Sequence, residues 1–237
     1  MPAESNESAT PRDLDLLATL PGVVSLLLVR HGRTAWNLER RFLGRTDVPL
    51  DDRGRREALA VGQRLARLPV AQVISSPLAR ASDTAQAIAL PHGLQVQPHP
   101  ELVELAQGVL EGQPSAELPL RHPAFLAAWL HDPGTARVPG GETLLECQAR
   151  GVKALLEIAR TGSPGRPIVV VSHQMLISSV LCHALGRPLR DFSAVGHANA
   201  AFSLLVLEGE RLVATHLQER AHLTGLDDEE RRTARTG

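Results

Sequence analysis

Two basic side chains that could handle a phosphoryl group stand side by side near the start of the chain. Arg30 and His31 directly follow the apolar run of residues 26–29, and Gly32 comes next. Arginine offers a rigid fork of hydrogen-bond donors that suits phosphate, and histidine can act as a nucleophile or carry a proton. Glycine lets the backbone come close to a bound anion. An ordinary polar strand end at the surface would have the same sequence pattern. The other segments of the chain must therefore distinguish it from a phosphate site.

A second histidine and a further arginine stand at equivalent points of the chain. His173 follows a run of valines, and Arg80 lies one turn after another short apolar segment. In an open α/β sheet the carboxyl ends of the strands meet at the edge where ligands bind. We therefore expect Arg30, His31, Arg80 and His173 to form a compact cationic pocket. Such a pocket suits a phosphoryl group, whose transition state spreads negative charge over three oxygens.

The elements that must position these residues alternate along the chain. Short apolar runs predict strands over residues 26–29, 71–75, 94–97 and 168–171, and a terminal hairpin over 200–207 and 212–217. Helices are expected after Asp51, from Ser76-Pro77 to about Leu90, over 124–130, after the turn at 139–142, and after His173. In the fourth of these helices the expected apolar stripe is Leu145, Ala149, Val152, Leu156 and Ala159. The order predicts an α/β fold, a three-layer sandwich with a mostly parallel sheet and helices on both faces.

The chain divides into one domain and two tails. We expect a flexible N-terminal tail over residues 1–22, with a helical turn at 13–20, and a charged C-terminal tail over 226–237. Residues 23–225 form the single domain. The segment 98–139 is rich in proline and glycine, which forbids long elements, and we interpret it as a lid inserted over the site.

Composition excludes several classes of function. The formal net charge of −1 gives no field that would favour nucleic acid or a membrane surface. No apolar run approaches the roughly 18 residues that span a bilayer. Residues 1–22 lack a basic stretch before an apolar core, so we do not expect them to be a signal peptide. The two cysteines, Cys147 and Cys182, lie in apolar helical contexts and are expected to be buried thiols, which favours a cytoplasmic protein.

Metal and nucleotide sites are also disfavoured. No carboxylates, cysteines and histidines have the spacing of metal ligands, so we expect neither a metal nor another cofactor. Lys153 is the only lysine of the chain, which excludes the Gly-Lys-Ser/Thr of a P-loop.

Several motifs along the chain together resemble those of one protein family. Residues 28–37, Leu-Val-Arg-His-Gly-Arg-Thr-Ala-Trp-Asn, resemble the signature of the histidine phosphatase superfamily, the phosphoglycerate-mutase-like proteins. The resemblance runs in order from about Val24 to Leu223, through Phe42, Gly44, Asp47, Pro49, Leu50, Gly54, residues 75–81, Thr84, Ala85, residues 102–104, Gly108, Glu111, Gly112, residues 140–143 and residues 171–173.

The resemblance implies a phosphoglycerate-mutase-like fold and a phosphohistidine mechanism. His31 would be the nucleophile, and Arg30, Arg80 and His173 would clamp the phosphoryl oxygens. Glu104 would give a proton to the leaving alcohol. Five more residues complete the set that we expect to bind phosphate: Gly32, Thr34, Gly44, Gln174 and Asn37.

Two positions depart from the family pattern. Gln174 stands where a glycine usually follows the second histidine, which affects how closely the backbone can approach the phosphate. Arg33 replaces a commonly acidic residue and would make the pocket mouth more basic, favouring a substrate with a second negative group.

Several charged residues have a plainer interpretation. Glu101 and Glu111 compete with Glu104 for the role of acid, and the motif favours Glu104. We interpret Arg150 as an exposed helix residue, and the cluster of Arg53, Arg55 and Arg56 as a solvated face.

The chain is therefore predicted to be a metal-independent phosphatase that hydrolyses a small phosphorylated metabolite through a phosphohistidine. The first alternative is a cofactor-dependent phosphoglycerate mutase, and the second is an inactive phosphate-binding module on the same fold. Against the mutase, the segment between Glu104 and His173 is shorter than mutases typically carry, and Leu105-Ala106-Gln107 is neutral where they have a basic-aromatic run. The resemblance also leaves a homodimer open.

Overall fold

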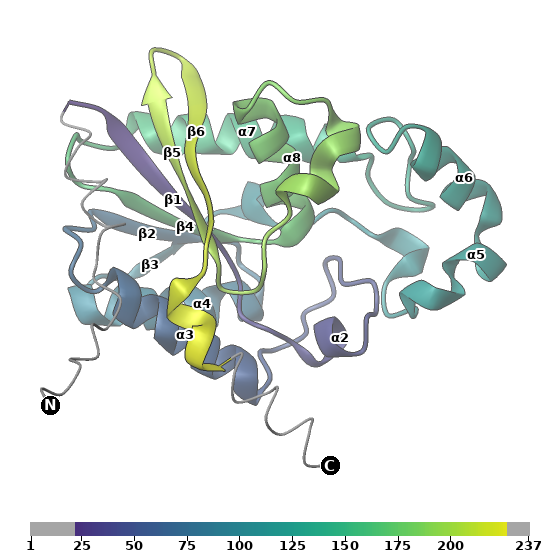
Figure 1. Ribbon diagram of the computed structural model, residues 1–237, viewed down its shortest axis with the longest axis horizontal. Coiled ribbons are helices and arrows are strands. Elements are labelled where there is room, and N and C mark those ends of the chain that lie inside the picture. The colour runs from purple at the N-terminus through teal and green to yellow at the C-terminus, as the bar shows by residue number, and fades with distance from the viewer. Residues whose placement is uncertain (1–21, 227–237) are drawn as a thin grey trace, which may run out of the picture.

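The computed structural model describes residues 22–226. The predicted tails and the helical turn expected at 13–20 lie outside the described residues, apart from positions 22 and 226. Six strands of the described part form one sheet in the order β3-β2-β4-β1-β5-β6 (Figure 1). Their bounds are β1 Val24–Arg30, β2 Gln72–Ser75, β3 Val96–Pro98, β4 Ile168–Ser172, β5 Phe202–Glu208 and β6 Arg211–Glu219.

The sheet is mostly parallel at its centre and antiparallel at one side. β4 pairs in parallel with β1 and β2, and β2 pairs in parallel with β3. β5 and β6 add the antiparallel hairpin next to β1. The carboxyl ends of β1 and β4 are aligned, because Arg30 of β1 is the register partner of Ser172 of β4. The predicted α/β sheet is thereby confirmed.

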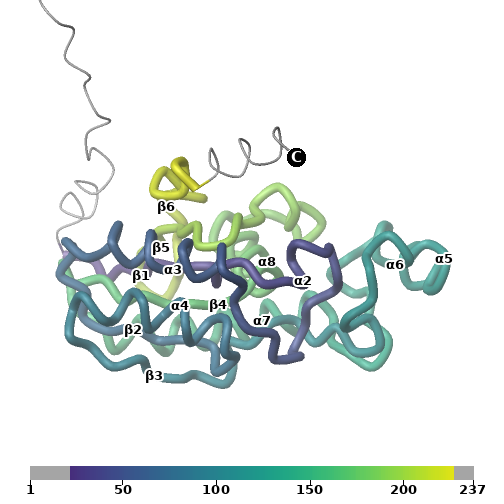
Figure 2. Tube along the Cα trace, turned by 90° about the horizontal axis from the view of Figure 1, so that it is seen from below, coloured from purple at the N-terminus to yellow at the C-terminus, as the bar shows by residue number. Residues whose placement is uncertain are grey.

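Helices α3 and α4 cover one face of the sheet, and α7 and α8 cover the other. The helices of the described residues are α2 Ala35–Leu38, α3 Asp52–Leu65, α4 Ala79–Ala89, α5 Leu118–Arg121, α6 Pro123–His131, α7 Leu144–Arg160 and α8 Gln174–Ala184. Alternate residues of β1 face opposite sides, as strand geometry requires. Leu26 and Leu28 join the core with α7 and α8, whereas Leu27 and Val29 join the core with α3 and α4. Figures 1 and 2 show the resulting three layers.

Two predicted boundaries are shifted. The helix expected from Ser76-Pro77 begins only at Ala79, because Leu78 is extended at its N-cap with φ −68° and ψ 136°. The strand expected over 94–97 is Val96–Pro98, the stretch that pairs with β2. The later start of α4 puts Arg80 in its first turn, beside the end of β2.

The apolar stripe predicted for α7 was wrong by about one residue. Leu145 is 51% exposed, whereas the buried residues are Leu144, Cys147, Gly151, Ala154, Leu155, Ile158 and Ala159. Two features set this rotation of the helix. Thr143 and Glu146 form a capping box, and Gly151 packs against Val180 and Leu176 of α8, where a Cβ would be 3.0 Å and 3.1 Å from side-chain carbons.

The segment 98–139 is built from short helices. It contains α5, α6 and three 3₁₀ turns, Pro100–Leu102, Gly108–Leu110 and Ser115–Glu117. In both views α5 and α6 lie beyond the end of the sheet, on the side of α2 (Figures 1 and 2). The helix expected over 124–130 is α6. That this segment acts as a lid stays a prediction.

Candidate active site

The two histidines predicted to meet are brought together by strand register. His31 and His173 each follow the aligned pair Arg30 and Ser172, and their ring centroids are 5.1 Å apart at an interplanar angle of 58°. Both side chains are buried, with 2% and 0% exposure. The parallel pairing of β1 and β4 is therefore what turns two distant motifs into one site.

His31 is held as a neutral imidazole. Its Nδ1 lies 2.7 Å from the carbonyl oxygen of Gly32, so a proton on Nδ1 leaves Nε2 as the basic nitrogen. Burial lowers the pKa of His31 well below its ordinary value, and the positive charges of Arg80 and Arg30 lower it further. An uncharged imidazole with a free lone pair is the form that attacks phosphorus.

His173 caps the start of α8 and is tied to the second strand end. Its Nε2 is 2.8 Å from Oγ of Ser76, while its Nδ1 is buried with no hydrogen-bond partner among residues 22–226. Burial and then the charge of Arg80 hold the pKa of His173 well below its usual range.

Arg30 is fixed from the far side of the pocket. Its Nη1 donates to Oε1 of Gln174 and to the carbonyl oxygen of His197, each at 2.6 Å. Burial lowers the pKa of Arg30 to about 10, which still leaves it charged at neutral pH. The side chain of Gln174 is thus a direct hydrogen-bond partner of Arg30.

Arg80 is fixed by the loop that follows α2. Its Nη2 donates to the carbonyl of Gly44 at 2.7 Å and its Nη1 to that of Thr46 at 2.9 Å. Glu111 holds this loop, because its carboxylate accepts from the backbone N–H groups of Arg45 and Thr46, each at 2.8 Å, and from the Thr46 hydroxyl. Gly44 packs so closely on Glu111 that a Cβ there would overlap the carboxylate.

Three polar atoms of the cluster are left without protein partners. Nε of Arg30, Nε of Arg80 and Nδ1 of His173 are all buried and make no hydrogen bond within the described part of the chain. Buried polar groups in folded proteins are usually satisfied. A bound oxyanion would supply the missing acceptors for the two guanidinium groups.

Glu104 is the acid that the structure brings to this cluster. It is 4% exposed, and its carboxylate accepts from the N–H of Leu105 at 2.8 Å, of Met175 at 3.1 Å and of Leu176 at 3.2 Å. The last two groups belong to the first turn of α8. Burial raises the pKa of Glu104 in spite of these bonds, so the carboxyl holds its proton more readily than usual. Of its competitors, Glu101 is exposed and Glu111 is engaged with the loop of Arg80.

The other predicted phosphate-binding residues shape the turn after β1. Thr34 and Asn37 form a capping box at α2, and Oδ1 of Asn37 also accepts from Asn199 at 3.4 Å. Gly32 donates its N–H to Thr84 at 3.0 Å, and a Cβ on Gly32 would overlap the carbonyl of Gly54. The hydroxyl of Thr34 is therefore used in the cap.

Three expectations for arginine residues were wrong. Arg33 does not add a free charge at the pocket mouth, because its Nε lies 2.8 Å from the Asp51 carboxylate. Arg53 is 7% exposed and pairs with Glu57, so only Arg55 and Arg56 of that cluster are on the surface. Arg150, expected to be exposed, turns inward because α7 is rotated as described above; its side chain is 13% exposed.

Three contributors were missed by the sequence analysis. Ser76 bonds to His173, the carbonyl of His197 holds Arg30, and Nδ2 of Asn199 donates to the carbonyl of His31 at 3.0 Å. Ser76 lies within a matching motif, but its type alone carries no signal. His197 and Asn199 belong to the loop before β5, the strand that pairs with β1, and spacing along the chain does not reveal that this loop contacts Arg30 and His31.

Within residues 22–226, no three side chains of His, Cys, Asp or Glu gather in a way that could hold a metal ion. In the same part of the chain, no helix is long and apolar enough to cross a membrane.

Comparison with known proteins decides the family. The sequence model of the histidine phosphatase superfamily, branch 1, matches residues 26–220. The chain belongs to this superfamily. It is 33% identical over 201 residues to phosphoserine phosphatase 1 of Hydrogenobacter thermophilus, a match that covers 85% of this chain and 95% of that protein. It is 36% identical over 166 residues to a probable phosphoglycerate mutase of Yersinia pestis, covering 70% of this chain and 77% of that protein.

Solved structures of this histidine phosphatase superfamily have the same fold. A mycobacterial glucosyl-3-phosphoglycerate phosphatase superposes with a TM-score of 0.75 at 28% identity, covering 84% of this chain and all of that one. The α-ribazole phosphatase of Shigella flexneri gives a TM-score of 0.74 at 26% identity, covering 84% and 98%. The protein is a phosphatase of the histidine phosphatase superfamily.

Proposed function

We propose that this protein hydrolyses a small phosphomonoester without a metal ion, through a covalent phosphate on His31. The observation that carries the proposal is the neutral, buried imidazole of His31 beside Arg30 and Arg80, whose Nε groups have no acceptor within the described part of the chain. The printed names of the relatives support the substrate class, since phosphoserine, glucosyl-3-phosphoglycerate and α-ribazole phosphate are all small phosphomonoesters.

The first chemical step transfers the phosphoryl group to the protein. Nε2 of His31 forms a bond to phosphorus while the bond from phosphorus to the ester oxygen breaks. The leaving oxygen takes the proton of the Glu104 carboxyl group, whose raised pKa keeps it available. Arg30, Arg80 and His173 hold the three equatorial oxygens, and the two guanidinium groups offset their charge.

The second step returns the protein to its starting state. Glu104, now a carboxylate, takes a proton from a water molecule as the water oxygen bonds to phosphorus. The bond from phosphorus to Nε2 breaks, which frees inorganic phosphate and the neutral imidazole. Phosphate-monoester hydrolysis needs rate factors of up to ~10²¹, and splitting it into two steps lowers each barrier.

Rapid quenching during turnover of a radiolabelled substrate tests the covalent intermediate. We expect label on His31 that is lost in acid and retained in alkali, as for a phosphoramidate. His31→Ala should lose the label and the activity while staying folded. Label on Ser75 or Ser76, or activity that chelation abolishes and Mg²⁺ or Zn²⁺ restores, would contradict the proposal.

A phosphoglycerate mutase is the second candidate, which the Yersinia relative favours. Mutases need a cover that retains the bound product. Here the neutral residues Leu105 and Gln107, which follow Glu104, are buried in the protein interior, with 1% and 8% exposure. We therefore expect free phosphate when 3-phosphoglycerate is supplied with catalytic 2,3-bisphosphoglycerate. Isomerisation faster than phosphate release from every monoester tested would favour the mutase, and no turnover of any aryl phosphate would favour an inactive module.

The cellular setting is part of the proposal. Cys147 and Cys182 are both buried and unpaired, which supports a reducing compartment and therefore the cytoplasm. The homodimer that the resemblance leaves open stays a prediction.

A further inference from the structure

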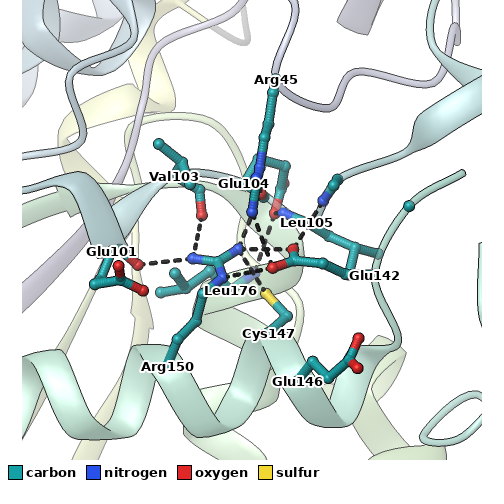
Figure 3. Close-up of polar contacts among 12 residues, drawn as sticks. Arg45, Glu101, Val103, Glu104, Leu105, Glu142, Glu146, Cys147, Arg150 and Leu176 are labelled. Carbon is teal, nitrogen blue, oxygen red and sulfur yellow. Dashed lines mark hydrogen bonds and ion pairs between the residues drawn. The ribbon is translucent and has the colours of Figure 1, made fainter.

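Arg150 lies outside the cationic pocket, yet it holds the segment that carries Glu104. The residue projects from α7, as Figure 3 shows. Its Nη1 donates to the carbonyl oxygens of Glu101 at 2.7 Å and Val103 at 2.8 Å. Its Nη2 donates to the carbonyl oxygen of Glu104 itself at 3.0 Å. One guanidinium group therefore binds three carbonyls within four consecutive residues of the Glu104 segment.

Glu142 completes the same arrangement. Its carboxylate pairs with Nε of Arg150 at 3.0 Å and accepts from the N–H of Ala106 at 2.9 Å. Arg45, from the loop that holds Arg80, approaches the same carboxylate at 2.9 Å (Figure 3). The backbone is thus fixed on both sides of Glu104, before it by Arg150 and after it by Glu142.

The Glu104 side chain is held independently of this arrangement. Its carboxylate is bound to the N–H groups at the start of α8, whereas its backbone is bound through Arg150 to α7. A proton donor works only when its oxygen lies within hydrogen-bond reach of the leaving atom, and a shift of about 1 Å can cost 10²-fold in rate. The Glu104 carbonyl also accepts from Nε of Arg45, but at 3.4 Å, so the Arg150 guanidinium at 3.0 Å is the closer of these two donors.

We propose that Arg150 is a positioning residue for the general acid, acting through the backbone of residues 101–104. This inference rests on the proposed function of Glu104. Loss of Arg150 leaves His31 and the two phosphate-site arginines with all the contacts described above. It should therefore impair proton donation to the leaving group and spare phosphoryl transfer from a substrate whose leaving group needs no proton.

The test measures kcat/KM for a nitrophenyl phosphate and for an alkyl phosphate in the same preparation. The ratio of the two values is independent of the fraction of active protein, so partial unfolding of a variant does not affect it. The variants are Glu104→Gln, Arg150→Gln, Arg150→Lys and the double variant. The matched control is Arg137→Gln, which removes an arginine that pairs with Glu146 at the start of α7 and whose side chain is 57% exposed.

We expect Glu104→Gln and Arg150→Gln to raise the nitrophenyl-to-alkyl ratio at least tenfold, since general acid catalysis contributes about 10² to 10⁴. Arg150→Lys should give a smaller shift in the same direction, because an ammonium reaches fewer of the carbonyls. The double variant should match Glu104→Gln within about twofold, as expected for residues that act as one unit. Arg137→Gln should leave the ratio unchanged.

Two results would overturn the inference, and they differ in what else they reject. If Glu104→Gln shifts the ratio but neither Arg150 variant does, only the role of Arg150 fails. If Glu104→Gln leaves the ratio unchanged, the proposed acid is wrong and the role of Arg150 fails with it. In the first case, equal losses on both substrates in the Arg150 variants would mean that Arg150 contributes only to the structure.

Discussion

Oε1 of Gln174 accepts a hydrogen bond from Nη1 of Arg30 at 2.6 Å. The residue that departs from the family pattern is therefore in direct contact with Arg30, an arginine that we propose to bind phosphate. The second acceptor of the same nitrogen is the His197 carbonyl. Removal of Gln174 leaves Arg30 one anchor, whereas a negative charge at this position would compete with the substrate for Arg30.

We predict that Gln174→Gly raises KM a few fold and that Gln174→Glu weakens phosphate binding at least about tenfold, because a carboxylate there would repel the anion. Steady-state kinetics and the inhibition constant of inorganic phosphate measure both effects. An unchanged inhibition constant in Gln174→Glu would place Gln174 away from the bound phosphate.

The pKa of His31 can be observed directly. We expect the ¹⁵N signals of the His31 imidazole in the free protein to stay those of the neutral form down to pH values below 6.5, because burial, Arg80 and Arg30 all disfavour the charged ring. The chain unfolded in urea is the control. The unfolded state then binds more protons than the folded state as the pH falls below 6.5, so His31 and His173 should reduce stability on acidification. Titration of His31 at or above pH 6.5 would contradict this prediction.

Glu111 should affect binding through Arg80 without touching the substrate. Glu111→Gln replaces a carboxylate that accepts from two backbone N–H groups and a hydroxyl of the loop at residues 45 and 46. Because that loop holds Arg80, we expect an affinity loss of about tenfold, or ~1.4 kcal/mol. The measurement is the inhibition constant of inorganic phosphate. Glu117→Gln, which alters a surface pair with Arg121, is the control that should change nothing.

Arg53 and Arg55 should differ sharply in their effect on stability. Arg53 forms a buried pair with Glu57, which in turn accepts from the N–H of Arg33 in the turn after β1. Arg53→Ala leaves a buried carboxylate without this partner and should cost about 3 kcal/mol. Arg55 pairs with the exposed Asp52, so Arg55→Ala should stay within about 0.5 kcal/mol. Urea unfolding measures the free energy of unfolding of both variants. Equal losses would mean that the buried ion pair stabilises the protein no more than the exposed one.

The sequence allowed the sheet edge and its basic residues to be predicted for a simple reason. Fully buried parallel strands are continuous apolar runs, so the points at which they stop, before His31 and after Val171, are visible in the sequence. The topology of such sheets then brings those points together. The alignment of Arg30 with Ser172, which sets how close the two rings lie, is a property of strand register and could not be predicted.

The role of Arg150 could not be predicted because α7 has apolar residues around much of its circumference. Two stripes one residue apart, one with Leu145 and one with Leu144, are both compatible with helical spacing. The capping box of Thr143 and the contact of Gly151 with α8 select the second stripe. That rotation turns Arg150 from the surface toward the Glu104 segment. Similarly, the pairing of Arg33 with Asp51 spans a loop and has no local signal.

The two buried guanidinium groups have a consequence for the folding equilibrium itself. Folding buries the charges of Arg30 and Arg80 close together, and burial is the main reason that the pKa of each is lowered. Among residues 22–226, their Nε groups find no acceptor. An oxyanion that binds only the folded chain offsets this cost, by an amount that grows with the logarithm of its concentration over Kd. The melting temperature should therefore depend on the buffer anion. Thermal denaturation can then rank phosphorylated metabolites as ligands even for a variant that does not turn them over.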